Sequence, residues 1–149
     1  MLGASITAEL YAYRGAIFYN MQKYDKAIQD FDNALILNPN LPEVYYNRGL
    51  LYHLFEPKQL EKALSNYDIA IEFNPYLVDA YNNRGIIYFA LKQYDNAIQD
   101  YIKAIQLDKE NIGYKLNLVE LYITLTNMMK QLAALKHILI NMLQKKVIC

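Results

Sequence analysis

The stretch Tyr81-Asn82-Asn83-Arg84-Gly85, YNNRG, has two near copies earlier in the chain, YYNRG at residues 45–49 and YAYRG at residues 11–15. Each copy combines an aromatic residue, two variable residues, arginine and glycine. The three glycines, Gly15, Gly49 and Gly85, are separated by 34 and 36 residues. A period of this length is typical of a solenoid, in which every repeat is one supersecondary unit that stacks on its neighbours.

A second repeated block follows each copy. It runs KYDKAIQDFDNAL from Lys23, LEKALSNYDIAI from Leu60 and QYDNAIQDYIKAI from Gln93, and the middle repeat carries two extra residues around FEPKQ. Apolar residues recur in both blocks at helical spacing, and proline or Asn-Pro breaks separate the blocks. Pro42 stands where it would open a helix at its first turn. The pattern predicts a unit of helix, turn, helix and short loop.

These residues resemble the tetratricopeptide repeats, whose pattern of about 34 residues is aromatic-x2-Leu-Gly-x2-Tyr, then Ala-x3-Phe, then Pro. The third copy matches at Tyr81, Gly85, Tyr88, Ala97 and Tyr101. The resemblance implies an all-α fold, a right-handed α-solenoid of stacked antiparallel helix pairs. A single domain, residues 1–149, would hold repeats at about 8–41, 42–77 and 78–111, followed by a degenerate C-terminal helix pair at about 112–147.

The charge balance argues against several classes of partner. Fifteen Lys and Arg residues offset fifteen Asp and Glu residues, so the formal net charge is zero, and we expect no binding to nucleic acid or to an anionic membrane. The first residues lack the pattern of a secretory signal, and no stretch approaches the ~18 apolar residues of a membrane span. The single cysteine, Cys149, forms no internal disulfide, which favours a cytoplasmic protein.

No catalytic constellation is visible in the sequence. His53 and His137 lie far apart and have no Cys, Asp or Glu at metal-ligand spacing. No serine lies in a nucleophile elbow, and no glycine-rich loop is present to hold phosphate. The sequence therefore predicts a protein that is not an enzyme and that has no metal site and no cofactor.

Arginine stands where the family usually has leucine, and polar partners recur in step with it. Arg14 and Arg84 each precede an aspartate by 16 residues, Asp30 and Asp100, and Asn66 takes this place in the middle repeat. We predict that each arginine of a first helix bonds to such a partner on a second helix, its own or its neighbour's. A partly exposed pair of this kind would be replaceable, so Arg84→Leu would cost little stability or even add to it.

The resemblance also implies a concave groove lined by the first helices, which in this family usually holds a segment of a partner protein. Asparagine precedes the arginine place in three successive copies, as Asn47, Asn83 and Asn117, and Asn82 adds a further amide. A carboxamide offers donors and an acceptor to a peptide main chain, and the row resembles the asparagine ladders of other solenoids. The alternative is that these amides cap local backbone or bind water.

Other residues of the expected groove would set its preference. An apolar and aromatic floor is predicted from Tyr46, Leu50, His53 and Phe89, and an acidic edge from Glu43 and Asp79. Acidic side chains favour basic residues in a ligand. The sequence thus predicts a binding module for an extended, neutral-to-basic protein segment.

The best-known groove ligand of this family is the acidic C-terminus of a heat-shock chaperone, held by a clamp of Lys, Asn, Asn, Lys and Arg. Carried over place by place, the clamp falls on Ala12, Ala16, Asn47, Asp79 and Asn83. Only Asn47 matches, and Asp79 stands where a cation is needed. We expect no binding of chaperone C-terminal tails.

Two further interpretations stay open, a self-associating module and a regulatory fragment of a larger protein, and the C-terminal segment is the reason for the first. It carries a stripe at spacings of four and three residues, formed by Met128, Leu132, Leu135, Leu139 and Met142. Docking onto the preceding helix would bury the stripe and close the core, whereas an exposed segment would support a homodimer. The residues expected to self-associate are Ile138, Ile140 and Val147. The chain would otherwise be a regulatory fragment of a larger multidomain protein.

Overall fold

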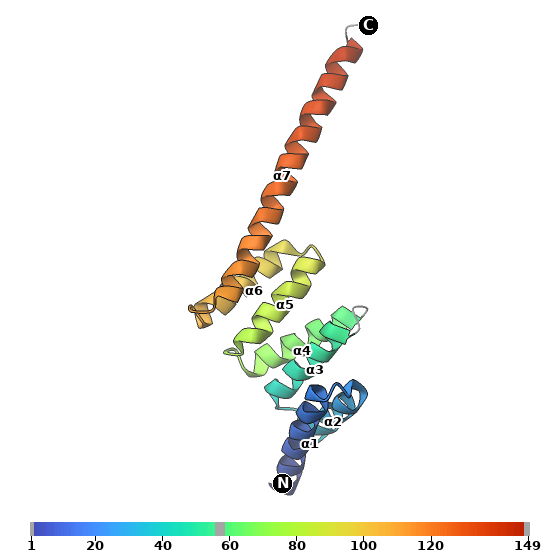
Figure 1. Cartoon of the computed structure of the whole chain (residues 1–149), viewed down its shortest axis with the longest axis vertical. Helices are drawn as coiled ribbons and strands as arrows, with labels where there is room; N and C mark the ends of the chain where they lie inside the picture. The colour runs from blue at the N-terminus through green and yellow to red at the C-terminus, as the bar shows by residue number, and fades with distance from the viewer. Residues whose placement is uncertain (1, 56–58, 148–149) are drawn as a thin grey trace.

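The computed structural model describes the backbone over residues 2–55 and 59–147, and side chains over residues 5–55 and 59–140. The described residues form α-helices and no strand (Figure 1). The helices are α1 (Leu2–Asn20), α2 (Tyr24–Leu37), α3 (Pro42–Phe55), α4 (Leu60–Phe73), α5 (Val78–Ala90), α6 (Tyr94–Leu107) and α7 (Ile112–Val147). The predicted alternation of first and second helices is thereby confirmed for three repeats.

The helices stack in consecutive pairs. α1 packs on α2, α3 on α4 and α5 on α6, and each second helix also packs on the first helix that follows it. Figure 1 shows these pairs succeeding one another from the blue N-terminal end to the yellow pair, with α7 extending well beyond them. The predicted all-α solenoid of stacked helix pairs is confirmed.

The repeat glycines lie where the two helices of a pair cross closely. A Cβ atom on Gly85 would lie 2.8 Å from Cε1 of Tyr101 and 3.3 Å from Cβ of Asp100. Interiors packed at crystal-like density leave no room for that atom. The same approach joins Gly15 to Phe31 and Gly49 to Tyr67. These aromatic rings are buried and fill the core.

The predicted arginine bonds are present in all three repeats. Arg84 donates to both carboxylate oxygens of Asp100, at 2.7 and 2.8 Å, and also to Asp68 of the preceding second helix, at 2.6 Å. Arg84 and Asp100 keep only 17% and 7% of their side-chain surface exposed. The expectation of a partly exposed, replaceable pair is therefore wrong for Arg84, whereas Arg14 of the first repeat is 58% exposed. Removing Arg84 would leave a carboxylate in the interior, which is costly.

The predicted C-terminal helix pair is wrong. Residues Ile112–Val147 form one continuous helix of 36 residues, α7. The physical reason is visible in the sequence, because neither proline nor glycine follows Gly113 and nothing ends the helix. Among the side chains of α7 that the structure describes, up to residue 140, those of the first part pack on the repeats, as far as the buried Leu121 and the nearby Leu125.

Candidate functional site

A chain of side-chain amides crosses three first helices. Asn117 of α7 donates to Oδ1 of Asn82 on α5 at 2.7 Å, and Asn82 donates to Oδ1 of the adjacent Asn83 at 3.4 Å. Asn83 in turn donates to the hydroxyl of Tyr46 on α3 at 3.2 Å. All four side chains are half-buried. The structure thus brings together three of the four predicted amides and one predicted aromatic residue, and we call this set together with Asn47 the ladder face.

An acidic group borders the ladder face. The hydroxyl of Tyr114 on α7 donates to Oδ1 of Asp79 on α5 at 2.6 Å, while the Asp79 residue as a whole stays exposed. Burial, and then the charge of Asp79, raises the pKa of Tyr46 to about 12. Burial and the bond to Asp79 also raise the pKa of Tyr114. Both hydroxyls therefore stay protonated at neutral pH, and Asp79 keeps free acceptor capacity.

Tyr114 belongs to this face although the sequence pattern did not point to it. It lies 35 residues after Asp79, close to one repeat period, and so comes from the next first helix. The repeat register could have indicated this contact. Asp79 lies six residues before Gly85, and Tyr114 lies five residues before Val119, the residue that is equivalent to Gly85 in the fourth copy. The degenerate pattern of the fourth copy concealed it.

Asn47 differs from the other amides. It lies on α3, one residue before Arg48, and its side chain is half-buried. Within the described part of the chain it makes no side-chain hydrogen bond, whereas Asn82, Asn83 and Asn117 bond to neighbouring helices. Its donors and its acceptor face solvent or a ligand. It is the amide of the ladder face best placed to pair with another main chain.

The residues predicted to line the floor of the groove are partly buried in the core. Leu50, His53 and Phe89 are half-buried, and Glu43 is exposed. The Nδ1 atom of His53 lies 3.5 Å from the hydroxyl of Tyr67, and burial lowers the pKa of His53. His53 is therefore neutral at physiological pH and acts as a packing residue with one polar edge.

The predicted self-association residues lie on the free part of α7. Ile138 and Ile140 are 54% and 50% exposed, and the side chain of Val147 lies outside the described residues. The stripe does not dock on the preceding helix, because Met128, Leu132, Leu135 and Leu139 are all exposed. The expectation that this segment closes the core is thus wrong beyond Leu125.

The described residues hold neither a metal-binding cluster nor a membrane span. Over these residues, no group of three or more His, Cys, Asp or Glu side chains is arranged to hold a metal ion. The helices in the same ranges include none with the length and apolar content needed to cross a membrane.

Models of known protein families identify the family of this chain. The family model described as TPR repeat matches residues 15–54 and 54–92, and the model described as tetratricopeptide repeat matches residues 78–111. The chain belongs to the tetratricopeptide repeat family. Human tetratricopeptide repeat protein 28 is 42% identical over 41 residues, which are 28% of this chain and 2% of that relative. The chain therefore spans a small fraction of that protein.

Solved tetratricopeptide repeat domains share the fold. The first TPR of Spaghetti (RPAP3), solved bound to the HSP90 peptide SRMEEVD, is 27% identical to this chain, with a TM-score of 0.75. The alignment covers 82% of this chain and 95% of the Spaghetti chain. The first TPR domain of human RPAP3 is 25% identical, with a TM-score of 0.74 and coverages of 85% and 98%. The Arabidopsis OM64 TPR domain, at 23% identity and a TM-score of 0.75, covers 81% and 98%.

Proposed function

We propose that this tetratricopeptide repeat chain is a protein-interaction module whose ladder face holds an extended, neutral-to-basic segment of a partner. The observation that carries the proposal is the row of amides that crosses α3, α5 and α7, with Asn47 unbonded in the described structure. Membership of a family of interaction modules supports the coarser statement. A peptide-bound structural relative supports it as well.

The chemistry of the face suits a main chain more than particular side chains. Each amide presents donors and an acceptor, so successive amides can pair with successive C=O and N–H groups of an extended segment. The exposed carboxylates of Asp79 and Glu43 then favour Lys or Arg in the ligand. Half-buried Leu50 and Phe89 offer shallow apolar contacts.

The test changes Asn47, Asn83 and Asn117 together to alanine. Probes are peptides selected from a random displayed library against the whole chain, and we expect the enriched sequences to be neutral to basic. Each lost hydrogen-bond pair should weaken binding by about 0.5–1.5 kcal/mol, measured by isothermal titration calorimetry. Unchanged affinity would show that the ladder face takes no part in binding.

Two controls separate binding from folding. Asn83 and Asn117 also join helices, so their replacement should lower the melting temperature slightly. Asn47→Ala removes no such bond and should weaken the peptide without changing the melting curve. Asn96→Ala is the matched variant away from the ladder face, because its exposed amide on α6 bonds only locally to Gln93. This variant should bind like the parent chain.

Chaperone C-terminal tails should not bind, although a structural relative was solved with one. At the places of the carboxylate clamp this chain has Asp79, which accepts a hydrogen bond from Tyr114, and Asn83, which is bonded to Tyr46. No cation stands at either place to neutralise a ligand carboxylate, and Asp79 repels it. Titration of the peptide SRMEEVD should show no saturable binding. Micromolar binding that Asn47→Ala abolishes would contradict this prediction.

Self-association is a second candidate function, favoured by the exposed apolar surface of α7. Ile138, Leu139 and Ile140 are exposed together beyond the last contact with the repeats, and exposed apolar patches of this kind mark interfaces. Multi-angle light scattering should then show a concentration-dependent dimer. Ile138→Glu should dissociate it without unfolding the repeats. A monomer at every concentration would remove this candidate.

A further inference from the structure

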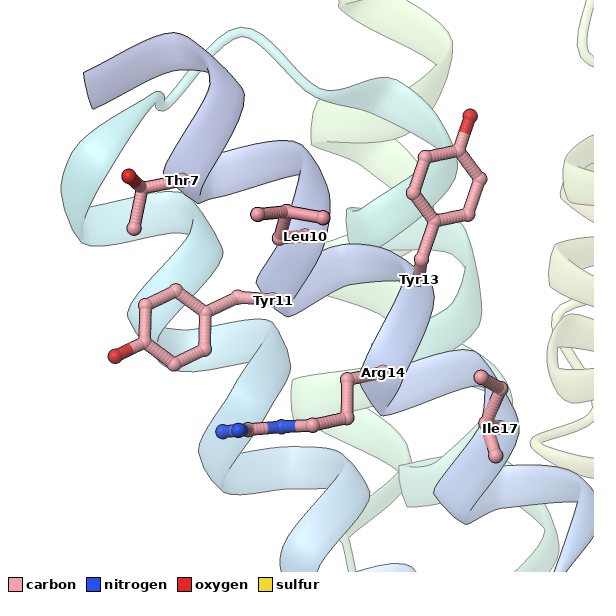
Figure 2. Close-up of a pocket in the computed structure, with 6 residues that line it drawn as sticks. All are labelled: Thr7, Leu10, Tyr11, Tyr13, Arg14 and Ile17. Carbon is pink, nitrogen blue, oxygen red and sulfur yellow. The ribbon is translucent and has the colours of Figure 1, made fainter. Parts of the chain in front are cut away.

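The outer face of α1 is apolar and uncovered. Leu10, Tyr13 and Ile17 are 62%, 70% and 56% exposed. Together with Thr7, Tyr11 and Arg14 they line an open hollow of about 470 Å³ (Figure 2). Figure 2 shows these side chains projecting from α1, with Arg14 beside Tyr11. We call these six residues the α1 face.

Two places of the α1 face, those of Leu10 and Ile17, are buried in every later repeat. Leu10 corresponds by repeat register to Val44, Ala80 and Tyr114, and Ile17 to Leu51, Ile87 and Leu121. Each of these six counterparts is 8% exposed or less. In the stack, they lie on first helices that pack against the second helix of the preceding repeat. The α1 face is therefore a stacking surface by its position and by its residues. A terminal repeat that ends a solenoid normally has a polar outer face.

Arg14 gives this surface a charge preference. Besides its partner in its own repeat, Asn66 for Arg48 and Asp100 for Arg84, each of these arginines bonds to a carboxylate on the preceding second helix. These carboxylates are Asp32 and Asp68, both at 2.6 Å. Arg14 bonds only to Asp30 of its own repeat in the described structure, and 58% of its side-chain surface is exposed. Beside Arg14, the position that Asp32 and Asp68 occupy next to the later arginines holds no carboxylate in the described structure.

The contact between α6 and α7 lacks this pairing of arginine with a carboxylate. In the third repeat, Ile102 stands in the place of Asp32 and Asp68, and on α7 Leu118 stands in the place of the arginine. Acid and arginine are thus replaced together by apolar residues. Arg14, by contrast, retains the cationic half of the pair.

We infer that the α1 face docks an amphipathic helix of a partner protein that carries an aspartate between two apolar residues. The two helices that cover the equivalent faces define the spacing, apolar-x3-Asp-x2-apolar: Ile28, Asp32 and Leu35 on α2, and Leu64, Asp68 and Ile71 on α4. The apolar residues of the ligand cover Leu10 and Ile17, and its aspartate bonds to Arg14. This site is separate from the ladder face and does not depend on the function proposed for it.

A peptide of residues 23–38, the sequence of α2, is the probe. In this peptide Gln29→Glu and Asn33→Lys supply a carboxyl and an amino group, which condense with loss of water to a side-chain lactam. The lactam keeps the peptide helical, because a free helix of this length is marginal in water. The labelled peptide is titrated with the whole chain by fluorescence anisotropy. We expect saturable binding, and about threefold to tenfold weaker binding of the peptide that carries Asp32→Asn, because one charge-assisted hydrogen bond is lost.

Leu10→Glu in the chain is the decisive variant. Leu10 is exposed, so the melting curve should stay unchanged, while binding should weaken more than about tenfold because a carboxylate enters the contact. The matched control is Leu132→Glu on the exposed part of α7, which should leave binding intact. A probe that merely displaces the chain's own α2 would bind Leu10→Glu as well as the parent.

Three results would overturn the inference. The first is no binding of the constrained peptide. The second is binding that is insensitive to Leu10→Glu. The third is a concentration-dependent dimer in light scattering that Leu10→Glu dissociates, because a second copy of the chain would then cover the α1 face.

Discussion

Arg84→Leu is expected to lower the free energy of unfolding by about 3–5 kcal/mol, the usual cost of removing one partner of a buried ion pair. Asp100 would be left in the interior without its cation, and Asp68 would lose its partner too. Burial lowers the pKa of Arg84, and the bonds and charges of Asp100 and Asp68 more than reverse this. Burial raises the pKa of Asp100 against the opposing effect of Arg84. Urea unfolding followed by circular dichroism measures the loss.

The second repeat supplies the matched control. It has Asn66 where the third repeat has Asp100, and Arg48 donates to Oδ1 of Asn66 at 2.9 Å. The amide of Asn66 donates in turn to the carbonyl of Lys62 at 2.8 Å. Asp100→Asn should therefore cost about 1 kcal/mol or less. In combination with Asp100→Asn, Arg84→Leu should cost clearly less than alone, because no buried charge remains beside it. A loss below about 1 kcal/mol for Arg84→Leu alone would contradict the buried pair.

Alkaline unfolding is the second large effect expected. Burial raises the pKa values of Tyr46 and Tyr101 to about 12, and those of Tyr67 and Tyr114 also rise. A raised tyrosine pKa stabilises the fold fully below the unfolded value of about 10, and this stability is lost as the pH rises through the folded pKa. For one group, a pKa that is one pH unit higher in the folded than in the unfolded state corresponds to a free-energy difference of about 1.4 kcal/mol. Ionisation of any of the four tyrosines therefore favours the unfolded chain.

The chain should therefore unfold cooperatively between about pH 10 and 12. Circular dichroism and tyrosinate absorbance should change together. Tyr101→Phe is the control, because Phe31 occupies the same place in the first repeat and fills the same space against its glycine. This variant should keep its stability at neutral pH and unfold at a higher pH than the parent. Tyrosinate forming well below the pH of unfolding would contradict the prediction.

The repeats could be predicted because small and aromatic residues must recur wherever helices cross. Gly85 lies against the ring of Tyr101, so a side chain at position 85 would collide with that ring. The partners of the arginines could be predicted from their spacing along the sequence. A shift of one helical turn between the two helices would move the charges apart, so the spacing must recur in each repeat. These features depend on residues that repeat in the sequence itself.

The depth of burial and the cross-helix bonds could not be predicted in the same way. The position of Arg84 beneath two second helices depends on the stacking angle, which no local pattern encodes. The bond of Asn117 to Asn82 likewise depends on the distance between first helices. The single helix α7 was in principle predictable, since no breaker follows Gly113, but the repeat period favoured a turn. The α1 face likewise depends on the folded structure, because Leu10 and Ile17 are exposed where their counterparts in later repeats are buried.

The proposed function requires that the ladder face bind the partner segment. The most direct test is to map amide chemical-shift changes in the whole chain when it binds the tightest peptide from the displayed library. We predict the largest changes at the side-chain amides of Asn47, Asn83 and Asn117 and at the backbone of α3 and α5 around them. Changes confined to the second helices α2, α4 and α6, or to the α1 face, would contradict the account.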